Sequence, residues 1–469
     1  MMKKLITLML MLTAVSIQAT DITVSKVKYN KEKQTVTFDL EWKNSWKNAK
    51  NHDAAWVFVK FEVPGQNPIH GRLTANGHNL RVVRYSVKPG LEVAPDQTGT
   101  FIKPLNNYRG DIHWQVDLKL NSDIAAQLPQ NAVVKVYAIE MVYIPEGGFT
   151  LGDPDPDAQK YSAVYKSDAE GNADGLYQIT SEDQVIEVGP KAGALYHKSG
   201  RYPQYTGDRS GPIPASFPKG VQPYYMMKYE VTQGQYAAFL NSLEPEWASQ
   251  LSPHTTDKYY ETRGSISVDN GKYIAASPNR PCNYITWDDG ALFADWAGLR
   301  PMTELEYVKA ARGPSEPKAH EFPWNTDNKE GLARMVDLDD ELKLKDGLNE
   351  SQLSDENRHR FGASYYWVMD LAGSLWEKCV SIGHPIGRAY TGTHGDGVLS
   401  KDGPVNADWP KGIKEEGGYG YRGGGYYEHG KTPGAYNPHS PIAYRPYAAW
   451  SGGKRLIAYS QRYVRTAAK

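Results

Sequence analysis

Residues 362–381 have the sequence GASYYWVMDLAGSLWEKCVS, and this stretch decides how the rest of the chain is interpreted. Apolar residues are dense in it, Gly373 interrupts them, and Glu377 follows a few positions later. A carboxylate in an apolar segment needs a partner, which is an arginine, a set of backbone N–H groups or a metal ion. A glycine just before it leaves nearby carbonyl groups free to face the same ion. The stretch therefore predicts either a paired carboxylate that fixes a loop or a calcium site.

Residues 367–377, WVMDLAGSLWE, resemble the signature GLYDMAGNVWEW of the formylglycine-generating-enzyme family, also called the sulfatase-modifying-factor family. Ser374 stands in place of the family's Asn, and Lys378 in place of its second Trp. In that family this loop is a calcium site. The resemblance thus implies calcium as a cofactor, held by the Glu377 carboxylate and the carbonyl groups of Ala372, Gly373 and Leu375.

Further blocks resemble the same family and follow in its order. They are residues 141–152 (MVYIPEGGFTLG), 224–236 (YYMMKYEVTQGQY), 281–289 (PCNYITWDD), 299–313 (LRPMTELEYVKAARG), 322–325 (FPWN), 421–426 (YRGGGY) and 463–465 (YVR). The likeness therefore covers residues 141–469 and implies a C-type-lectin-like domain. We expect residues 153–219, which are polar, and residues 326–360, which are charged, to be insertions in that domain.

Local patterns inside these blocks predict particular elements. A threonine followed three positions later by Gln, Asp or Glu is typical of a capped helix start, and it occurs at Thr232–Gln235, Thr286–Asp289 and Thr303–Glu306. The last of these helices should end at Gly313. Residues 141–152 have two apolar runs around Gly147 and Gly148, which predicts a β-hairpin.

Residues 20–140 predict strands. Apolar and polar residues alternate over 36–42 and 114–120, and runs of β-branched or aromatic residues cover 54–63 and 132–139. This pattern is typical of a β-sandwich. The expected fold class is therefore α+β, with an all-β sandwich at 20–140 that should fold alone, followed by the C-type-lectin-like domain.

Composition limits the classes of partner. The chain has 469 residues, with 53 basic and 54 acidic side chains and a net charge of −1, so nothing favours a nucleic acid. Residues 1–19 have two lysines and then an apolar run, which is the layout of a secretory signal peptide. No later stretch is apolar enough for a membrane span. We expect an exported protein that is periplasmic, on the outer surface or secreted.

Cys282 and Cys379 are the two cysteines of the chain. In an exported protein two cysteines can form one disulfide. Two unpaired buried thiols are the equal alternative.

The oxidase chemistry of the family depends on a pair of cysteines soon after its Arg-Gly-Gly strand, because Cu(I) prefers thiolate ligands. In this chain residues 426–433 are YYEHGKTP, and no cysteine follows Cys379. The spacing His-x-x-x-His-x-Glu of the related iron enzymes is also absent from the sequence. We therefore expect neither copper nor iron and no catalytic residues.

Aromatic residues are numerous near the C-terminal end, where the family lines its ligand cleft. Aromatic side chains stack on sugars or peptides at low entropic cost. We expect about half of these residues to be core and the ligand-binding set to comprise Tyr426, Tyr427, Tyr444 and Trp450.

These observations predict a non-catalytic binding or scaffold protein of the kind that the Bacteroidota export. The resemblance extends to gliding and secretion-machinery proteins, so the expected partner is a protein or glycan of the cell envelope. One alternative is a metal-dependent oxidase with unfamiliar ligands. Another is a variable ligand-binding protein of the retroelement-diversified type, which uses the same fold.

Overall fold

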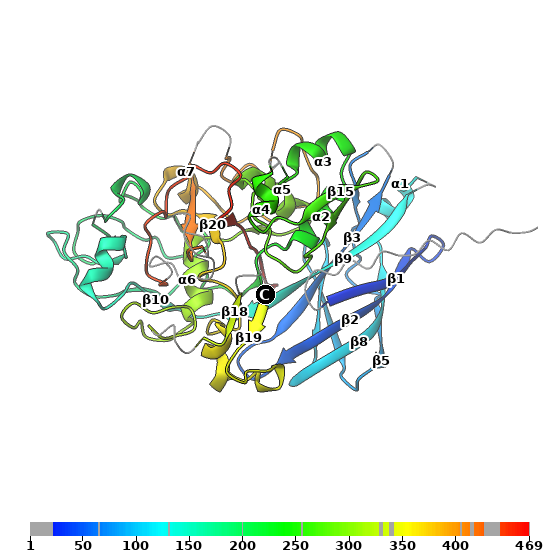
Figure 1. Cartoon of the computed structure of the whole chain (residues 1–469), viewed down its shortest axis with the longest axis horizontal. Coiled ribbons are helices and arrows are strands. Elements are labelled where there is room, and N and C mark those ends of the chain that lie inside the picture. Colours follow the sequence, from blue (N-terminus) through cyan, green and yellow to red (C-terminus); the bar gives the residue numbers. More distant parts are fainter. Residues whose placement is uncertain are drawn as a thin grey trace, which may run out of the picture.

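The computed structural model describes residues 22–63, 66–129, 132–198, 200–254, 257–327, 332–336, 342–403, 406–412, 417–425 and 441–468. It is a mixed α+β structure in which a β-sheet region precedes the domain that resembles the formylglycine-generating-enzyme family. We call this second part, from residue 141 onward, the family-like domain. In Figure 1 the long strands of this N-terminal region lie to the right, and the short elements around α6 and β20 lie to the left. None of the helices in the described ranges has the length and apolarity needed to cross a membrane.

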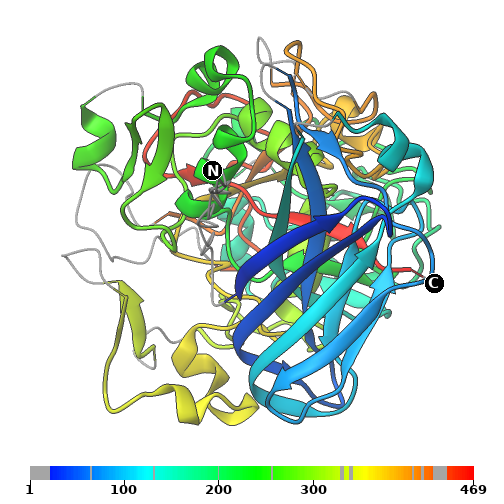
Figure 2. The same ribbon diagram turned by 90° about the vertical axis from the view of Figure 1, so that its right-hand side faces the viewer.

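A four-stranded antiparallel sheet forms one layer of the N-terminal region (Figure 2). Its strands, in spatial order, are β1 (Ile22–Asn30), β2 (Thr35–Lys47), β8 (Tyr108–Lys119) and β5 (Asn79–Arg84). The predicted alternation is confirmed in β2, where Val36, Phe38 and Leu40 are buried. One face of the sheet therefore supplies a hydrophobic core.

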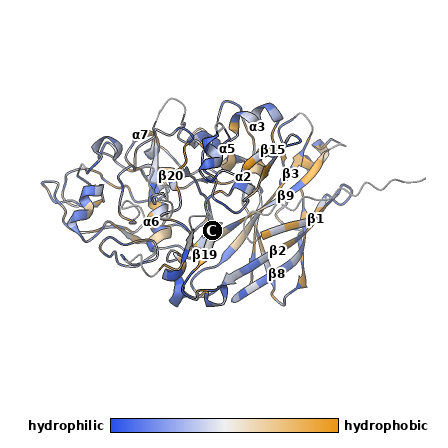
Figure 3. Cartoon of the chain, viewed as in Figure 1, coloured by the Kyte–Doolittle hydropathy of each residue, from blue (hydrophilic) through white to orange (hydrophobic). Residues whose placement is uncertain are grey.

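The second sheet has eight strands, which come from both parts of the chain. In spatial order they are β17 (Arg300–Pro301), β23 (Tyr463–Thr466), β14 (Tyr224–Met227), β9 (Val133–Ile144), β3 (Asp53–Glu62), β7 (Thr100–Pro104) and β6 (Pro89–Val93), with β4 (Ile69–His70) beside β3. One cluster of apolar residues packs between this sheet and the first, including Phe38, Trp114 and Val57. Figure 3 shows the hydrophobic residues of β3 and β9.

Strand β9 joins the two parts of the chain. Residues 133–142 of it pair with β3, and residues 141–144 pair with β14, which belongs to the family-like domain. The boundary expected after Glu140 therefore falls inside a strand. The face of β3 and β7 that carries Trp56, Phe58 and Phe101 packs into the core of the second domain. Residues 20–140 thus lack two of the surfaces that independent folding would require, and we revise the expectation that they fold alone.

Short strands and helices make up the remainder. The other strands are β10 (Phe149–Leu151), β11 (Tyr165–Lys166), β12 (Tyr177–Ile179), β13 (Leu195–Tyr196), β15 (Ile266–Asp269), β16 (Lys272–Ala275), β18 (Arg334–Val336), β19 (Leu342–Leu344), β20 (Trp376–Val380), β21 (Tyr419–Arg422) and β22 (Tyr459–Ser460). The α-helices are α1 (Ser122–Gln127), α2 (Gln233–Asn241), α3 (Pro245–Leu251), α4 (Lys258–Glu261), α5 (Trp287–Trp296), α6 (Glu304–Arg312) and α7 (Pro385–Arg388). The 3-10 helices are η1 (Pro156–Tyr161), η2 (Pro203–Tyr205), η3 (Glu350–Gln352) and η4 (Asp355–Phe361).

All three predicted helix starts are confirmed. Thr232, Thr286 and Thr303 cap α2, α5 and α6, and in each case the capping box is complete. Helix α6 ends at Gly313, as predicted, with this residue at a positive φ of 65°. These local bonds satisfy N–H groups that the first turn of a helix leaves free.

The predicted hairpin at 141–152 is wrong in its pairing. Both strands exist, but β10 pairs with β12, and β9 pairs with β3 and β14. The Gly147–Gly148 turn therefore sends the chain out of the large sheet. The reason is that β14 and β3 occupy both edges of β9, which leaves no position there for β10.

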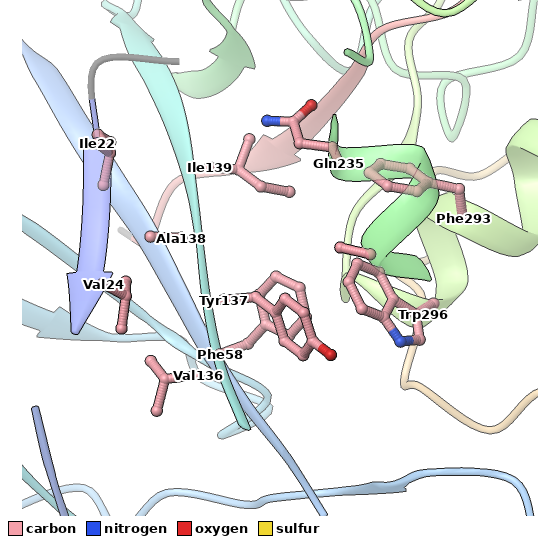
Figure 4. Close-up of a pocket in the computed structure, with 11 residues that line it drawn as sticks. Ile22, Val24, Phe58, Val136, Tyr137, Ala138, Ile139, Gln235, Phe293 and Trp296 are labelled. Atoms are coloured by element: carbon pink, nitrogen blue, oxygen red, sulfur yellow. The ribbon is translucent and has the colours of Figure 1, made fainter. Parts of the chain in front are cut away.

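A cavity of about 20 Å³ lies where β1 and β9 meet α2 and α5 (Figure 4). Its walls are mostly aliphatic and aromatic, and Trp296 and Phe293 close it on the helical side. This cavity marks the contact between the N-terminal strands and the helices of the second domain.

Candidate functional site

The carboxylate of Glu377, in β20, is paired with Arg462. Its Oε2 accepts a hydrogen bond from Nε at 2.5 Å, and its Oε1 accepts one from Nη2 at 2.7 Å. Both side chains are fully buried. The remaining guanidinium nitrogen donates to the carbonyl groups of Met227 and Lys228. Of the two alternatives that the sequence left open for Glu377, the structure therefore has the arginine pair.

A second buried carboxylate holds the turn that leads into β20. Glu230 accepts a hydrogen bond from the Ser374 hydroxyl at 2.6 Å and from the Leu375 N–H at 3.0 Å. Burial and the nearby Glu377 raise the pKa of Glu230 well above its usual value. Ser374, the departure from the family's Asn, thus has a defined role, which is to tie its loop to the segment after β14.

The donor set does not fit the calcium site that the resemblance implies. The Arg462 guanidinium places a positive charge against both oxygens of Glu377, where calcium would need them. Ala372, Gly373 and Leu375 lie in the turn before β20, and the Gly373 N–H donates to the Gly423 carbonyl at 3.1 Å. In the described ranges, no cluster of three or more His, Cys, Asp or Glu residues could hold a metal ion.

Cys282 and Cys379 are free and fully buried. The structure thus has the unpaired thiols and not the disulfide. Burial raises the pKa of both thiols above the usual value, so neither is a thiolate near neutral pH. Because Cu(I) binding requires accessible thiolates, these two residues do not fit a copper site. Residues 426–433, which follow the Arg-Gly-Gly strand, lie outside the described residues.

The Arg-Gly-Gly strand itself ends on a buried charge cluster. Arg422, the last residue of β21, donates through Nη1 to Glu304 Oε2 at 3.0 Å. Arg445 donates to the same carboxylate, from Nε at 2.7 Å and from Nη2 at 3.0 Å. Glu304 is the first residue of α6, so this cluster holds both the strand and the 441–450 loop against the helix.

The loop that Arg445 holds contains part of a group of partly exposed aromatic rings, which we call the aromatic surface. Its members are half-buried and come from three separate segments: Tyr202 and Tyr205, Tyr447 and Trp450, and Tyr459. Tyr202 stacks on Tyr447 with ring centroids 5.2 Å apart, and Trp450 lies 5.4 Å from Tyr205 and 5.8 Å from Tyr459. Buried rings of Trp376 and Tyr421 support it from below. Such a set of ring faces and edges can contact a sugar or peptide.

The structure places the predicted ligand-binding residues differently. Trp450 is part of the aromatic surface, whereas Tyr444 is buried in another cluster, where it stacks on Tyr161 at 4.2 Å and bonds to His320 at 2.8 Å. Tyr426 and Tyr427 lie outside the described residues. The expectation that about half of the C-terminal aromatic residues are core holds for the described ones, since Tyr421, Tyr444 and Tyr463 are buried.

Sequence reasoning missed Tyr202 and Tyr205. They lie in the 153–219 segment, which we expected to be a surface insertion only. The available signal was weak, namely a high density of tyrosine in an otherwise polar segment. Lys378 departs from the family's pattern, but the sequence does not indicate that this residue lies near the aromatic surface. Its Nζ lies 5.8 Å from the Tyr421 ring centre and donates to the Ile285 carbonyl at 2.7 Å, and burial lowers its pKa to about 7.

Comparison with known proteins adds an independent result. Residues 126–452 match the family model described as "Sulfatase-modifying factor enzyme 1-like domain". The chain is similar to the formylglycine-generating enzyme of Thermomonospora curvata, with 28% identity over 110 residues, which are 23% of this chain and 36% of that protein. It is also similar to the formylglycine-generating enzyme of Streptomyces coelicolor, with 26% identity over 129 residues, which are 27% of this chain and 40% of that protein. The matches thus span well under half the length of these curated relatives.

Proposed function

The chain belongs to the family of sulfatase-modifying factor enzyme 1-like domains, and on that premise we propose that it is an exported, non-catalytic member that binds a protein or glycan of the cell envelope. The observation on which this proposal rests is the aromatic surface, which five half-buried rings from three segments form together.

The lack of suitable sulfur ligands supports a non-catalytic function. No cysteine follows Cys379 in the sequence, so the place after the Arg-Gly-Gly strand has no thiol. The two cysteines of the chain are buried, and their raised pKa values keep them protonated. A reaction that holds a substrate thiol between two thiolates on Cu(I) therefore has no protein ligands of the required kind.

The construction of the aromatic surface supports binding. Arg445 fixes the loop that carries Tyr447 and Trp450, because its side chain bonds to Glu304 and its N–H donates to the Tyr161 carbonyl at 2.8 Å. Rings that are already held in place lose little conformational entropy when a ligand stacks on them. A sugar ring or an aromatic or proline side chain of a peptide is the ligand chemistry that suits them.

Export is proposed from the sequence of residues 1–19. Two lysines followed by an apolar run match a secretory signal peptide. An exported binding protein would meet its partner in the periplasm, on the outer surface or outside the cell.

The test is an array that displays envelope glycans and peptides, probed with the labelled protein without residues 1–19. Trp450→Ala should lower binding to the recognised ligand by about tenfold or more, since stacking contributes about 1–3 kcal/mol per ring. The matched control is Tyr85→Ala, which removes an aromatic ring that is 37% exposed on the N-terminal region.

Equal binding by the wild-type protein and Trp450→Ala would contradict the role of the aromatic surface. Reduced binding by the Tyr85→Ala control would instead place the contact on the N-terminal sheets.

The alternative is a metal-dependent oxidase with ligands that differ from those of the family. It predicts that the protein retains copper or iron through purification and consumes oxygen with a cysteine peptide. Metal analysis by mass spectrometry, compared with an oxygen-electrode trace, distinguishes it from the binding function.

A further inference from the structure

A buried cluster beside β21 has more positive than negative charge. Arg422 and Arg445 both bond to one carboxylate, that of Glu304, and the three side chains are at most 3% exposed. The ion pairs of the described residues give these two guanidinium groups no second acid. Arginine keeps its proton in proteins, so the cluster has one positive charge in excess.

Arg422 also has a buried N–H group without an acceptor in the described part of the chain. Its Nε has no hydrogen-bond partner among the described residues, although the atom is buried. Nη1 donates to Glu304, and Nη2 donates to the carbonyl of Ile442. A buried N–H that lacks an acceptor costs about 1–3 kcal/mol, and more when the group is charged.

Arginines with a carboxylate of their own behave differently. Arg300 pairs with Glu306, and Arg462 pairs with Glu377, each through two hydrogen bonds. The pKa of each of these two guanidinium groups is raised, because the dedicated carboxylate outweighs the effect of burial. Burial lowers the pKa of Arg422, and the positive charge of Arg445 lowers it further. Glu304 raises it, but Arg422 shares this carboxylate with Arg445, so the net change is downward. Arg422 is therefore a buried guanidinium that lacks full charge compensation.

A cavity lies next to this cluster. Its volume is about 10 Å³, which is close to the smallest space that holds one water-sized particle. Charged side chains line one part of it and apolar side chains line the rest: Glu304, Arg312, Arg422 and Arg445, with Leu151, Val164, Leu305, Val308, Ile382 and Ala443. Arg312 has its own acid, Glu321, at 2.9 Å. This pair is neutral, so it neither adds to the excess positive charge of the cluster nor compensates it.

We propose that this cavity binds one small monovalent inorganic anion of the chloride class, which accepts a hydrogen bond from Arg422 Nε and neutralises the Glu304–Arg422–Arg445 cluster. A water molecule could accept the same hydrogen bond but would leave the excess charge in place. An uncompensated buried charge is strongly destabilising, so an anion is the better occupant. The residues of this site are not members of the aromatic surface, and the proposal does not depend on the proposed function.

The decisive experiment is crystallography with bromide. Bromide replaces chloride chemically and scatters anomalously, so crystals of the full protein are grown or soaked in sodium bromide, and data are collected at the bromine edge. The proposal predicts an anomalous peak in the cavity beside Arg422 Nε. A cavity without a bromine signal, whether dry or filled by water, overturns it.

A solution measurement uses variants that change the cavity and leave every charge unchanged. The melting temperature is compared in chloride and in gluconate at the same ionic strength. The wild-type protein should melt about 2–4 °C higher in chloride. Ala443→Val adds two methyl groups at the cavity wall and should lose this difference. Ala163→Val, in the same small apolar cluster but not on the cavity wall, should keep it.

Equal melting temperatures of the wild-type protein in chloride and gluconate would count against the proposal, as would a chloride effect that survives in Ala443→Val. If Ala443→Val does not fold, the bromide signal in wild-type crystals still decides the question.

Discussion

The two parts of this molecule have interiors of different kinds. The core between the N-terminal sheets consists of aliphatic and aromatic side chains, such as Phe38, Trp114 and Val57. The interior of the family-like domain adds a set of guanidinium groups, and the largest fully buried side chains of the chain include Arg300, Arg312, Arg422, Arg462 and Arg465. The first part has long strands, whereas the second has short elements and long loops.

This difference explains how each part keeps its shape. Long paired strands satisfy their own backbone groups and need only an apolar face to pack. Loops that enter a core need specific partners for their polar groups. Glu377, Glu230 and Glu304 supply such partners, each with loop residues or arginines that are distant in sequence. The charged interior thus fixes the loops on which the aromatic surface stands.

The largest effect is expected when the N-terminal part is produced without the second part. A fragment of residues 20–140 should not form a stable monomer, because it ends inside β9 and lacks the pairing with β14. It would also expose Trp56, Phe58 and Phe101, which pack against the second domain. Far-ultraviolet circular dichroism and size-exclusion chromatography of the fragment test this expectation. A monomer with cooperative thermal unfolding would show that the N-terminal sheets are independent after all.

A smaller effect is expected when one buried ion pair of the second part is broken. Glu377→Gln leaves the buried Arg462 guanidinium without its counter-charge and should lower the free energy of unfolding by about 3–5 kcal/mol. Chemical denaturation followed by tryptophan fluorescence measures the change.

The matched control for Glu377 is Glu244, which pairs with Lys401 at 2.8 Å on the surface, with side chains 30% and 54% exposed. Glu244→Gln should change the free energy of unfolding by at most about 1 kcal/mol. If the two variants lost similar stability, the buried pair would not be the main support of the 370–377 loop.

A gain in stability is expected at a buried lysine where the two parts meet. Lys60, on β3, is fully buried, and its Nζ has no hydrogen-bond partner in the described ranges. Replacing it by Met should raise the free energy of unfolding at pH 7 by about 1–4 kcal/mol, because burial disfavours the Lys60 charge by more than the nearby Asp295 and Asp396 favour it. Lys228→Met is the control and should have the opposite sign, since Lys228 pairs with Glu140 at 2.7 Å.

The pH dependence sharpens this test. Burial lowers the pKa of Lys60 to about 7 in the folded state, whereas an unfolded lysine has a pKa near 10.4. Between these values the unfolded state binds more protons, so Lys60 makes stability rise with pH by about 1.4 kcal/mol per unit. The advantage of Lys60→Met over the wild-type protein should therefore shrink steadily from pH 7 to pH 10. An advantage that stays constant over this range would mean that Lys60 keeps its proton in the folded state up to pH 10, so that burial does not lower its pKa.

Features that depend on neighbouring residues in the sequence were predicted well. The alternating strands and the capped helices at Thr232, Thr286 and Thr303 follow from periodicity and from bonds that span three residues. The family resemblance placed these blocks in one domain, and the match over residues 126–452 supports that domain.

Features that depend on distant residues were not predicted. The choice of β12 over β9 as the partner of β10 is a long-range competition between strand edges. The pairing of Glu377 with Arg462 joins positions 85 residues apart, and no local pattern marks it. The aromatic surface likewise needs Tyr202 to meet Tyr447, which only the folded chain brings together.

The most direct test of the proposed non-catalytic function is to offer the protein the substrate peptide of the oxidase chemistry that the family resemblance implies. The purified protein is incubated with a Cys-x-Pro-x-Arg peptide in air, with and without copper, and the peptide is then analysed by mass spectrometry. We predict an unmodified cysteine in both samples, because the two protein thiols are buried and protonated. A formylglycine product that the wild-type protein forms and that Cys379→Ser does not form would contradict the account.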